Sequence, residues 1–293
     1  MIKTSYQLCR VFGIPIYLDI SLILLMFLFV RGYDNPLYGL AAGVFLLLSI
    51  TLHELGHSLT SMAFGCRVRD ITLMIIGGRA TLENMPRKHW QEFLVAIAGP
   101  AVSLALGLAG YFVPAYLFHA GYLTDNLAGF IMYSVGKLNL MLFGFNLLPA
   151  FPMDGGRILR SALQVRMSRL RATWIASRIG RFLAGTMIFF ALCNILGINL
   201  PNPRIPGAVG TLFWHFISDG SYFKLLIGWV IFSAAGSEYR QVLAEEGGGP
   251  RAPFGFPFFG AKTPPPPDDG KAVVSPPPYA RGGSTRVDVR KED

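Results

Sequence analysis

The sequence predicts an all-α polytopic membrane protein with about six transmembrane helices and a short β-hairpin between the second and third spans. Its 293 residues are 52% apolar and only 15% charged, and the mean hydropathy is +0.46. Several apolar runs reach about 20 residues, the length that a helix needs to cross a bilayer. These values exclude a soluble globular protein, a collagen-like chain and a wholly disordered one.

Six apolar runs are candidate spans. They cover residues 14–30, 37–59, 91–118, 127–149, 177–199 and 211–235. We expect the first run to be a retained helix, because no A-x-A cleavage pattern follows it. The last run is interrupted by Ser218-Asp219-Gly220. Either one span or a re-entrant stretch followed by a short helix therefore fits that run.

Two patterns lie in and around the third run. Before it, residues 71–76 predict a short apolar strand, Gly77-Gly78 a turn and residues 79–83 a second strand. The alternative is a membrane-surface loop with one apolar strand. Within the third run, Gly99, Ser103 and Gly107 recur every four residues. This spacing is typical of a helix face that packs closely against another helix.

The basic residues predict the orientation in the membrane. Five Lys or Arg lie between the second and third runs, whereas residues 119–126 hold none, and residues 155–181 hold seven Arg without Asp, Glu or Lys. Cytoplasmic loops are enriched in such residues, so we expect these loops and both termini on the cytoplasmic side of the plasma membrane. This arrangement also accounts for the net charge of +9. The lipid bilayer is then the expected partner, and nucleic acid is not.

The chain divides into a membrane domain, residues 1–240, and a tail, residues 241–293. Ten of the twenty Pro lie in 250–278, which predicts a disordered Pro/Gly-rich cytoplasmic tail. Pro276-Pro277-Pro278-Tyr279 has the form of a WW-domain ligand, but a linker is the favoured interpretation. The three cysteines are odd in number and outside any CxxC pattern, so they predict neither a disulfide framework nor a thiolate zinc site.

His53-Glu54-Leu55-Gly56-His57 forms an HExxH motif at the predicted cytoplasmic end of the second run. Residues i and i+4 of a helix lie one turn apart on the same face, so His53 and His57 are placed to hold one metal ion. Glu54 lies beside them. The alternative is a set of helix-bridging hydrogen bonds, which buried polar residues commonly make in membrane helices.

A catalytic zinc site usually has three protein ligands and a water, so the two histidines need a third partner. Asp154 is the candidate, because it follows the fourth run at the same predicted depth as the HExxH motif. Pro149 and Pro152 break the helix there, and irregular backbone persists at membrane depth only where it lines a polar cavity. Taken alone, Asp154 fits equally well as an interfacial helix-end acid with Gly155-Gly156 as a helix stop.

Together, His53-Glu54-x-x-His57 and Asn146-x-x-Pro149-x-x-x-x-Asp154-Gly155 resemble the motifs of the site-2 protease family of intramembrane zinc metalloproteases. The resemblance covers about residues 10–240. Its lesser matches are Gly13-Ile14-Pro15-Ile16, Gly77-Gly78, Ala98-Gly99-Pro100 and Asn139-Leu140. Ser103 departs from the family pattern, which often has Asn there, so no catalytic role is assigned to it.

The resemblance implies one Zn²⁺ per chain, held by His53, His57 and Asp154, with Glu54 as the catalytic base and Asn146 near the substrate carbonyl. It also implies an intramembrane endopeptidase that cuts membrane-anchored proteins, such as membrane-tethered transcription regulators or anti-sigma factors. The edge of the predicted hairpin would suit an unwound substrate segment. The sequence predicts no oligomeric state.

The alternative function is a catalytically inactive zinc-binding membrane protein or a transporter. A transporter spreads its polar ligands over several spans, whereas the candidate ligands here cluster on the second and fourth runs. A protein that only binds zinc has no need of a carboxylate at Glu54.

Overall fold

The computed structural model describes residues 4–75, 77–84, 88–122, 127–198 and 222–247. The predicted tail beyond residue 247, including the Pro276–Tyr279 motif, lies outside the described residues. So do residues 211–221, the first part of the predicted last span.

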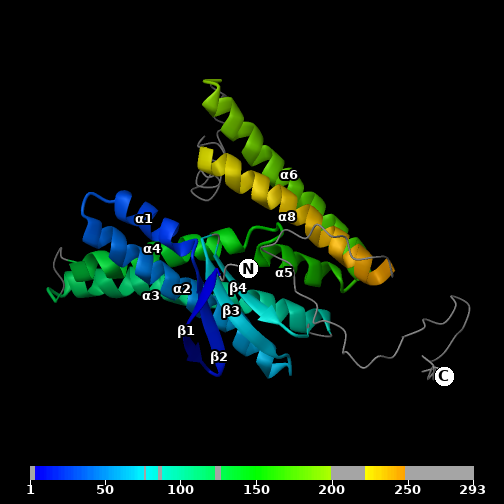
Figure 1. The fold of residues 1–293 in the computed structure, drawn as a ribbon, viewed down its shortest axis with the longest axis horizontal. Coiled ribbons are helices and arrows are strands. Elements are labelled where there is room, and N and C mark those ends of the chain that lie inside the picture. Colours follow the sequence, from blue (N-terminus) through cyan, green and yellow to red (C-terminus); the bar gives the residue numbers. More distant parts are fainter. Residues whose placement is uncertain (1–3, 76, 85–87, 123–126, 199–221, 248–293) are drawn as a thin grey trace, which may run out of the picture. The chain divides into compact units, whose positions relative to one another are not determined.

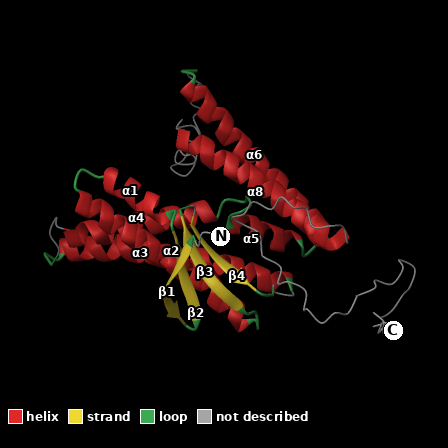
Figure 2. Cartoon of the chain, in the orientation of Figure 1, coloured by secondary structure: helices red, strands yellow, loops and turns green. Residues whose placement is uncertain are grey.

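Eleven elements follow one another in the described residues (Figure 1). They are β1 (Ser5–Val11), β2 (Ile14–Asp19), α1 (Leu22–Arg31), α2 (Pro36–Ala63), β3 (Val68–Met74), β4 (Gly77–Leu82), α3 (His89–His119), α4 (Leu127–Asn146), α5 (Asp154–Leu163), α6 (Arg169–Ile195) and α8 (Tyr222–Gly247). Figure 2 shows the four strands side by side in one sheet. The described part of the chain is therefore mostly helical, with one small sheet.

Four of the described helices are long and apolar enough to cross a membrane: α2, α3, α4 and α6. They correspond to the second, third, fourth and fifth predicted runs. Their ends are set by local chemistry. At the start of α2, for example, the Asn35 side chain accepts a hydrogen bond from the Leu37 backbone, and Pro36 stands at the first helical positions. A proline there costs no helix hydrogen bond.

The prediction of one helical span over residues 14–30 is wrong. Residues 14–19 form β2, and α1 has only ten residues, about 15 Å of helix and half the thickness of the hydrocarbon core. Hydropathy misses this difference, because a buried strand and a buried helix are equally apolar. The alternation of Ile14 and Ile16, both 2% exposed, is the strand signal in this segment. Four helices of the described residues are long and apolar enough to span a membrane, so the predicted count of about six spans is not confirmed, and a four-stranded sheet corrects the all-α prediction.

The sheet has the order β1-β2-β3-β4, so β1 and β4 are its edges. β2 and β3 pair in parallel, while the outer pairs are antiparallel. The predicted hairpin between the second and third spans is confirmed as β3 and β4. Its turn lies earlier than predicted, because Met74 pairs with Gly77 and both glycines belong to β4. The apolar side chains of β2 and β3 pack in one core with those of α1 and α2.

Glycines allow the spanning helices to approach closely. A Cβ on Gly136 of α4 would lie 2.5 Å from the Gly110 backbone of α3, and one on Gly110 would meet Gly136 equally closely. On α2, a Cβ on Gly56 would lie 3.0 Å from the carbonyl oxygen of Ala98 in α3. Helix α3 is therefore pressed against both α2 and α4 at positions where a larger residue would force the helices apart.

We predict that Gly136→Ala destabilises the protein, because its methyl group would collide with the Gly110 backbone. Overpacking of this kind costs about 1–3 kcal/mol, which thermal unfolding in detergent would show as a lower Tm. Gly144→Ala is the matched control on the same helix, since a Cβ there meets nothing within 4 Å. Equal Tm values for the two variants would contradict the close packing of α3 and α4.

Candidate metal centre

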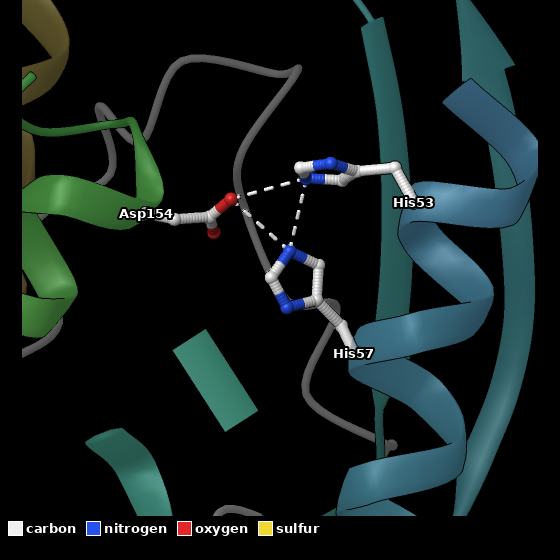
Figure 3. Close-up of side chains that lie close together, drawn as sticks. All are labelled: His53, His57 and Asp154. Carbon is white, nitrogen blue, oxygen red and sulfur yellow. Dashed lines mark hydrogen bonds and ion pairs between the residues drawn. The ribbon is translucent and has the colours of Figure 1, made fainter. Parts of the chain in front are cut away.

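Two histidines of α2 and the first residue of α5 converge inside the protein (Figure 3). His53 and His57 are one helical turn apart, and their side chains point the same way toward Asp154. The three residues are only 3%, 7% and 8% exposed. Segments about 100 residues apart in the sequence thus bring one cluster of possible metal ligands together.

The three ligand atoms form an equilateral triangle. His53 Nε2 and His57 Nε2 each lie 3.1 Å from Asp154 Oδ2, and the two nitrogens lie 3.1 Å from one another. A zinc ion with tetrahedral bonds of about 2.0–2.1 Å separates neighbouring ligand atoms by roughly 3.3 Å. The triangle therefore has the size of one face of a zinc coordination tetrahedron.

Hydrogen bonds on the far side of each ring favour metal binding. His57 Nδ1 lies 2.6 Å from the carbonyl oxygen of Val95, which only accepts, so Nδ1 is the donor. A neutral His57 then presents the lone pair of Nε2 to the cluster. His53 Nδ1 lies 2.9 Å from the Ser103 hydroxyl, which is fully buried. Such partners orient metal-binding histidines. When Nδ1 is the donor in both rings, the two Nε2 lone pairs and the Asp154 carboxylate face one point.

Asp154 is suited to the same task through its charge. Burial raises the pKa of its carboxyl, but in the absence of a metal ion the charge of a protonated His57 and hydrogen bonds donated by both histidines outweigh burial and hold the pKa well below its usual range. The carboxylate is therefore ionised at neutral pH.

Asp154 begins α5 rather than ending a helix, so the interpretation of Gly155-Gly156 as a helix stop is wrong. A Cβ on Gly155 would lie 2.2 Å from the Leu148 carbonyl, so glycine lets α5 start against the preceding loop.

Helix α3 provides the space that the cluster needs. A Cβ on Gly99 would lie 2.2 Å from His57 Nε2 and 2.7 Å from His53 Nε2. The sequence predicts that Gly99, Ser103 and Gly107 form one helix-packing face. Gly107 does pack against Leu140 of α4, whereas Gly99 and Ser103 face the histidines. The sequence analysis missed this role of Ser103. Its spacing of four residues from Gly99 was the available signal, because it places both residues on one helix face.

The other two predicted site residues lie apart from the ligand triangle. Glu54 is half-buried on α2, and its carboxylate accepts a hydrogen bond from the backbone of Ala80 in β4. A Cβ on Gly78 would lie 2.4 Å from Glu54 Cγ, so β4 passes directly against this side chain. Asn146 is the last residue of α4, and its amide donates to the Leu142 carbonyl one turn earlier, at 3.0 Å. The structure thus places Glu54 beside the β4 edge, and Asn146 at a helix end with its amide bonded to its own helix.

Residues 41–129 and 119–187 match the model of peptidase family M50. The chain belongs to peptidase family M50. Among relatives, it is 38% identical over 194 residues to a zinc metalloprotease of Methanocaldococcus jannaschii, a match that covers 65% of this chain and 55% of that protein. It is 36% identical over 118 residues to stage IV sporulation protein FB of Bacillus subtilis, covering 39% of this chain and 37% of the relative. The chain thus spans little more than half the length of the curated relative from M. jannaschii.

A solved structure extends the M50 comparison to the fold. The site-2 protease from M. jannaschii matches with a TM-score of 0.55 and 32% sequence identity, over 80% of this chain and 95% of that one. The M50 match includes His53, His57 and Asp154, so the residues that the structure brings together lie inside the part of the chain that defines the family.

We predict that Ser103→Ala lowers the zinc affinity about ten- to hundredfold, as loss of a hydrogen-bond partner behind a metal-binding histidine typically does. Titration against a chelator of known affinity would measure this in the purified protein. Ser177→Ala is the control, because Ser177 is also buried but donates to the Ala235 carbonyl. A Ser103→Ala protein with wild-type zinc affinity would show that this hydrogen bond does not orient His53.

Proposed function

We propose that this protein is an intramembrane zinc endopeptidase that hydrolyses peptide bonds within or next to transmembrane segments of membrane-anchored proteins. The observation that carries the proposal is the buried triangle of acceptor atoms from His53, His57 and Asp154, three residues of a chain that belongs to family M50. The residues fit one zinc ion per chain by distance, tautomer and charge. The triangle includes two residues of an apolar helix long enough to span a membrane.

In this proposal His53, His57 and Asp154 hold the metal, and Glu54 is the catalytic base. When bound, zinc polarises a carbonyl and makes a water molecule more acidic. The Glu54 carboxylate accepts a proton from the attacking water and then delivers it to the nitrogen of the leaving amine. Glu54 follows the first ligand directly in the helix, and its charge interacts with those of both histidines and Asp154. Its position next to the ligands supports this role.

The β4 edge is the proposed substrate-binding element. A helical substrate hides its carbonyls in hydrogen bonds within the helix, so the segment to be cut has to be bound extended. β4 is an edge strand, and it contacts the proposed base through Gly78 and Ala80. An extended segment added to this edge would lie beside Glu54. Asn146 is proposed to donate to the substrate carbonyl or the developing oxyanion, for which its amide would have to release the Leu142 carbonyl.

The placement in the membrane is also proposed from the sequence. Seven Arg in residues 155–181 support a cytoplasmic position for α5 and the start of α6. In this placement both termini and the active site would face the cytoplasm of a cell with this protein in its plasma membrane. Residues 241–293 would form the cytoplasmic tail. Proposed substrates are membrane-tethered transcription regulators or anti-sigma factors.

A catalytically inactive zinc binder or a transporter is less well supported. The candidate ligands form one compact cluster, whereas transport requires a path of polar sites across the membrane. Glu54 is retained beside the ligands, in contact with the sheet edge. Both observations favour hydrolysis.

We predict that Glu54→Gln abolishes proteolysis but keeps zinc, because the amide cannot take a proton while all three ligands remain. Asp154→Ala should lower both the zinc content and the activity. The measurement is zinc content per chain and chelator-sensitive cleavage of a single-span test substrate by protein purified in detergent. Loss of a catalytic base of this kind costs at least about 10²–10⁴-fold in rate.

Two results would contradict this assignment. Wild-type rates in Glu54→Gln would remove Glu54 from the mechanism, and zinc binding without cleavage of any substrate in a varied panel would favour the inactive binder. Gly144→Ala serves as a control for handling in detergent, since a Cβ added at residue 144 meets nothing within 4 Å in the described structure.

A further inference from the structure

A buried ion network lies on the helix that begins with Asp154. Arg160 of α5 is 2% exposed. Its Nε and Nη2 both donate to Glu92 Oε1 of α3, and its Nη1 lies 2.6 Å from Glu238 Oε1 of α8. The guanidinium carbon also lies 5.1 Å from the centre of the Phe151 ring, in the loop before α5. One arginine thus joins α5 to two other helices and to the loop that precedes Asp154.

This network fixes the position of α5, because the N–H groups of a planar guanidinium point in set directions. Two adjacent N–H groups of the planar guanidinium converge on one oxygen of Glu92, so the arginine and this carboxylate hold α5 close to the start of α3. Gln164, one turn after Arg160, adds a contact of 3.5 Å to the other Glu92 oxygen. Loss of either Arg160 or Glu92 is costly, because the remaining charge is then buried without an opposite charge beside it. Helix α5 is therefore held against α3 at one defined position.

Glu92 belongs to the same face of α3 that orients the histidines. Glu92, Val95, Gly99 and Ser103 follow at intervals of three or four residues, which places them in one stripe. Glu92 binds Arg160, the Val95 carbonyl accepts from His57, Gly99 leaves room for both rings, and Ser103 contacts His53. A single helix face thus contacts both histidine ligands and the helix that carries the third candidate ligand.

We propose that Arg160, through its fork on Glu92, is a positioning residue that sets Asp154 against His53 and His57. This inference rests on the proposed zinc site. Asp154 is the first residue of a ten-residue helix and Arg160 lies in its last turn, about 9 Å further along the axis. A short rigid helix transmits a shift at one end to the other, so slippage of α5 along α3 would open the 3.1 Å triangle. Glu238 binds the same arginine from α8, whereas the hydrogen-bond partners of both histidines belong to α3, so Glu238 provides a matched control.

The test is the zinc affinity of the full chain in detergent, measured by chelator competition. Glu92→Gln should lower it about tenfold, a typical effect of displacing a metal ligand's support. Arg160→Lys should act in the same direction, because lysine keeps the charge and loses the fork; it also serves if Glu92→Gln does not fold. Glu238→Gln, which removes the other carboxylate, should stay within about twofold of wild type.

The same substitutions in an Asp154→Ala background separate positioning from general stability. Without the carboxylate, Glu92→Gln should change the remaining zinc affinity by less than about twofold, since the coupled partner is absent. An equal loss in both backgrounds, or an equal loss in Glu238→Gln, would overturn the inference. So would folded Glu92→Gln and Arg160→Lys proteins that bind zinc like wild type. Absence of zinc binding in the wild-type protein would instead overturn the proposed function itself.

Discussion

Three possible metal-ligand atoms, His53 Nε2, His57 Nε2 and Asp154 Oδ2, are held 3.1 Å apart inside this protein. They come from two helices far apart in the sequence, so the surrounding structure has to hold them in place. Helix α2 supplies two of the atoms through the one-turn spacing of its histidines. α5 supplies the third, and α3 passes so close to both rings that only glycine fits at residue 99. The packing of these helices is therefore organised around the positions of three atoms.

The β-sheet belongs to the same arrangement. Its apolar side chains pack with α2, the helix that carries the histidines, and its last strand bonds to Glu54 through the backbone of Ala80. The element proposed to present the substrate and the group proposed to transfer protons are thus fixed to one another directly. This contact explains why a mostly helical membrane protein retains a sheet at its site.

Much of the site could be predicted from the sequence, because its signals are local. The HExxH spacing follows from the helical repeat, and the prolines at 149 and 152 mark the break before Asp154. Glu92 and Arg160 could not be found in this way, and the spacing of Ser103 from Gly99 indicates its helix face but not its partner. Their partners lie 50 or more residues away, and such pairs leave no periodic pattern. For residues 14–19, hydropathy reports burial equally in a strand and in a helix, so the sequence favoured a span where the structure has β2. The roles of Glu54 and Asn146 stay predictions, since no contact with a substrate tests them.

Gly99 has a consequence for how relatives of this protein are classified. Replacement by alanine, the smallest side chain, would put a methyl group 2.2 Å from His57 Nε2 while leaving every donor atom in the chain. Such a homologue would keep the complete signature of a hydrolase and still lack the volume in which a metal ion could sit. An inventory of ligands would count it as an active enzyme. A search for inactive members of this family therefore has to check for a larger residue at the position of Gly99 as well as for loss of the metal-ligand motifs.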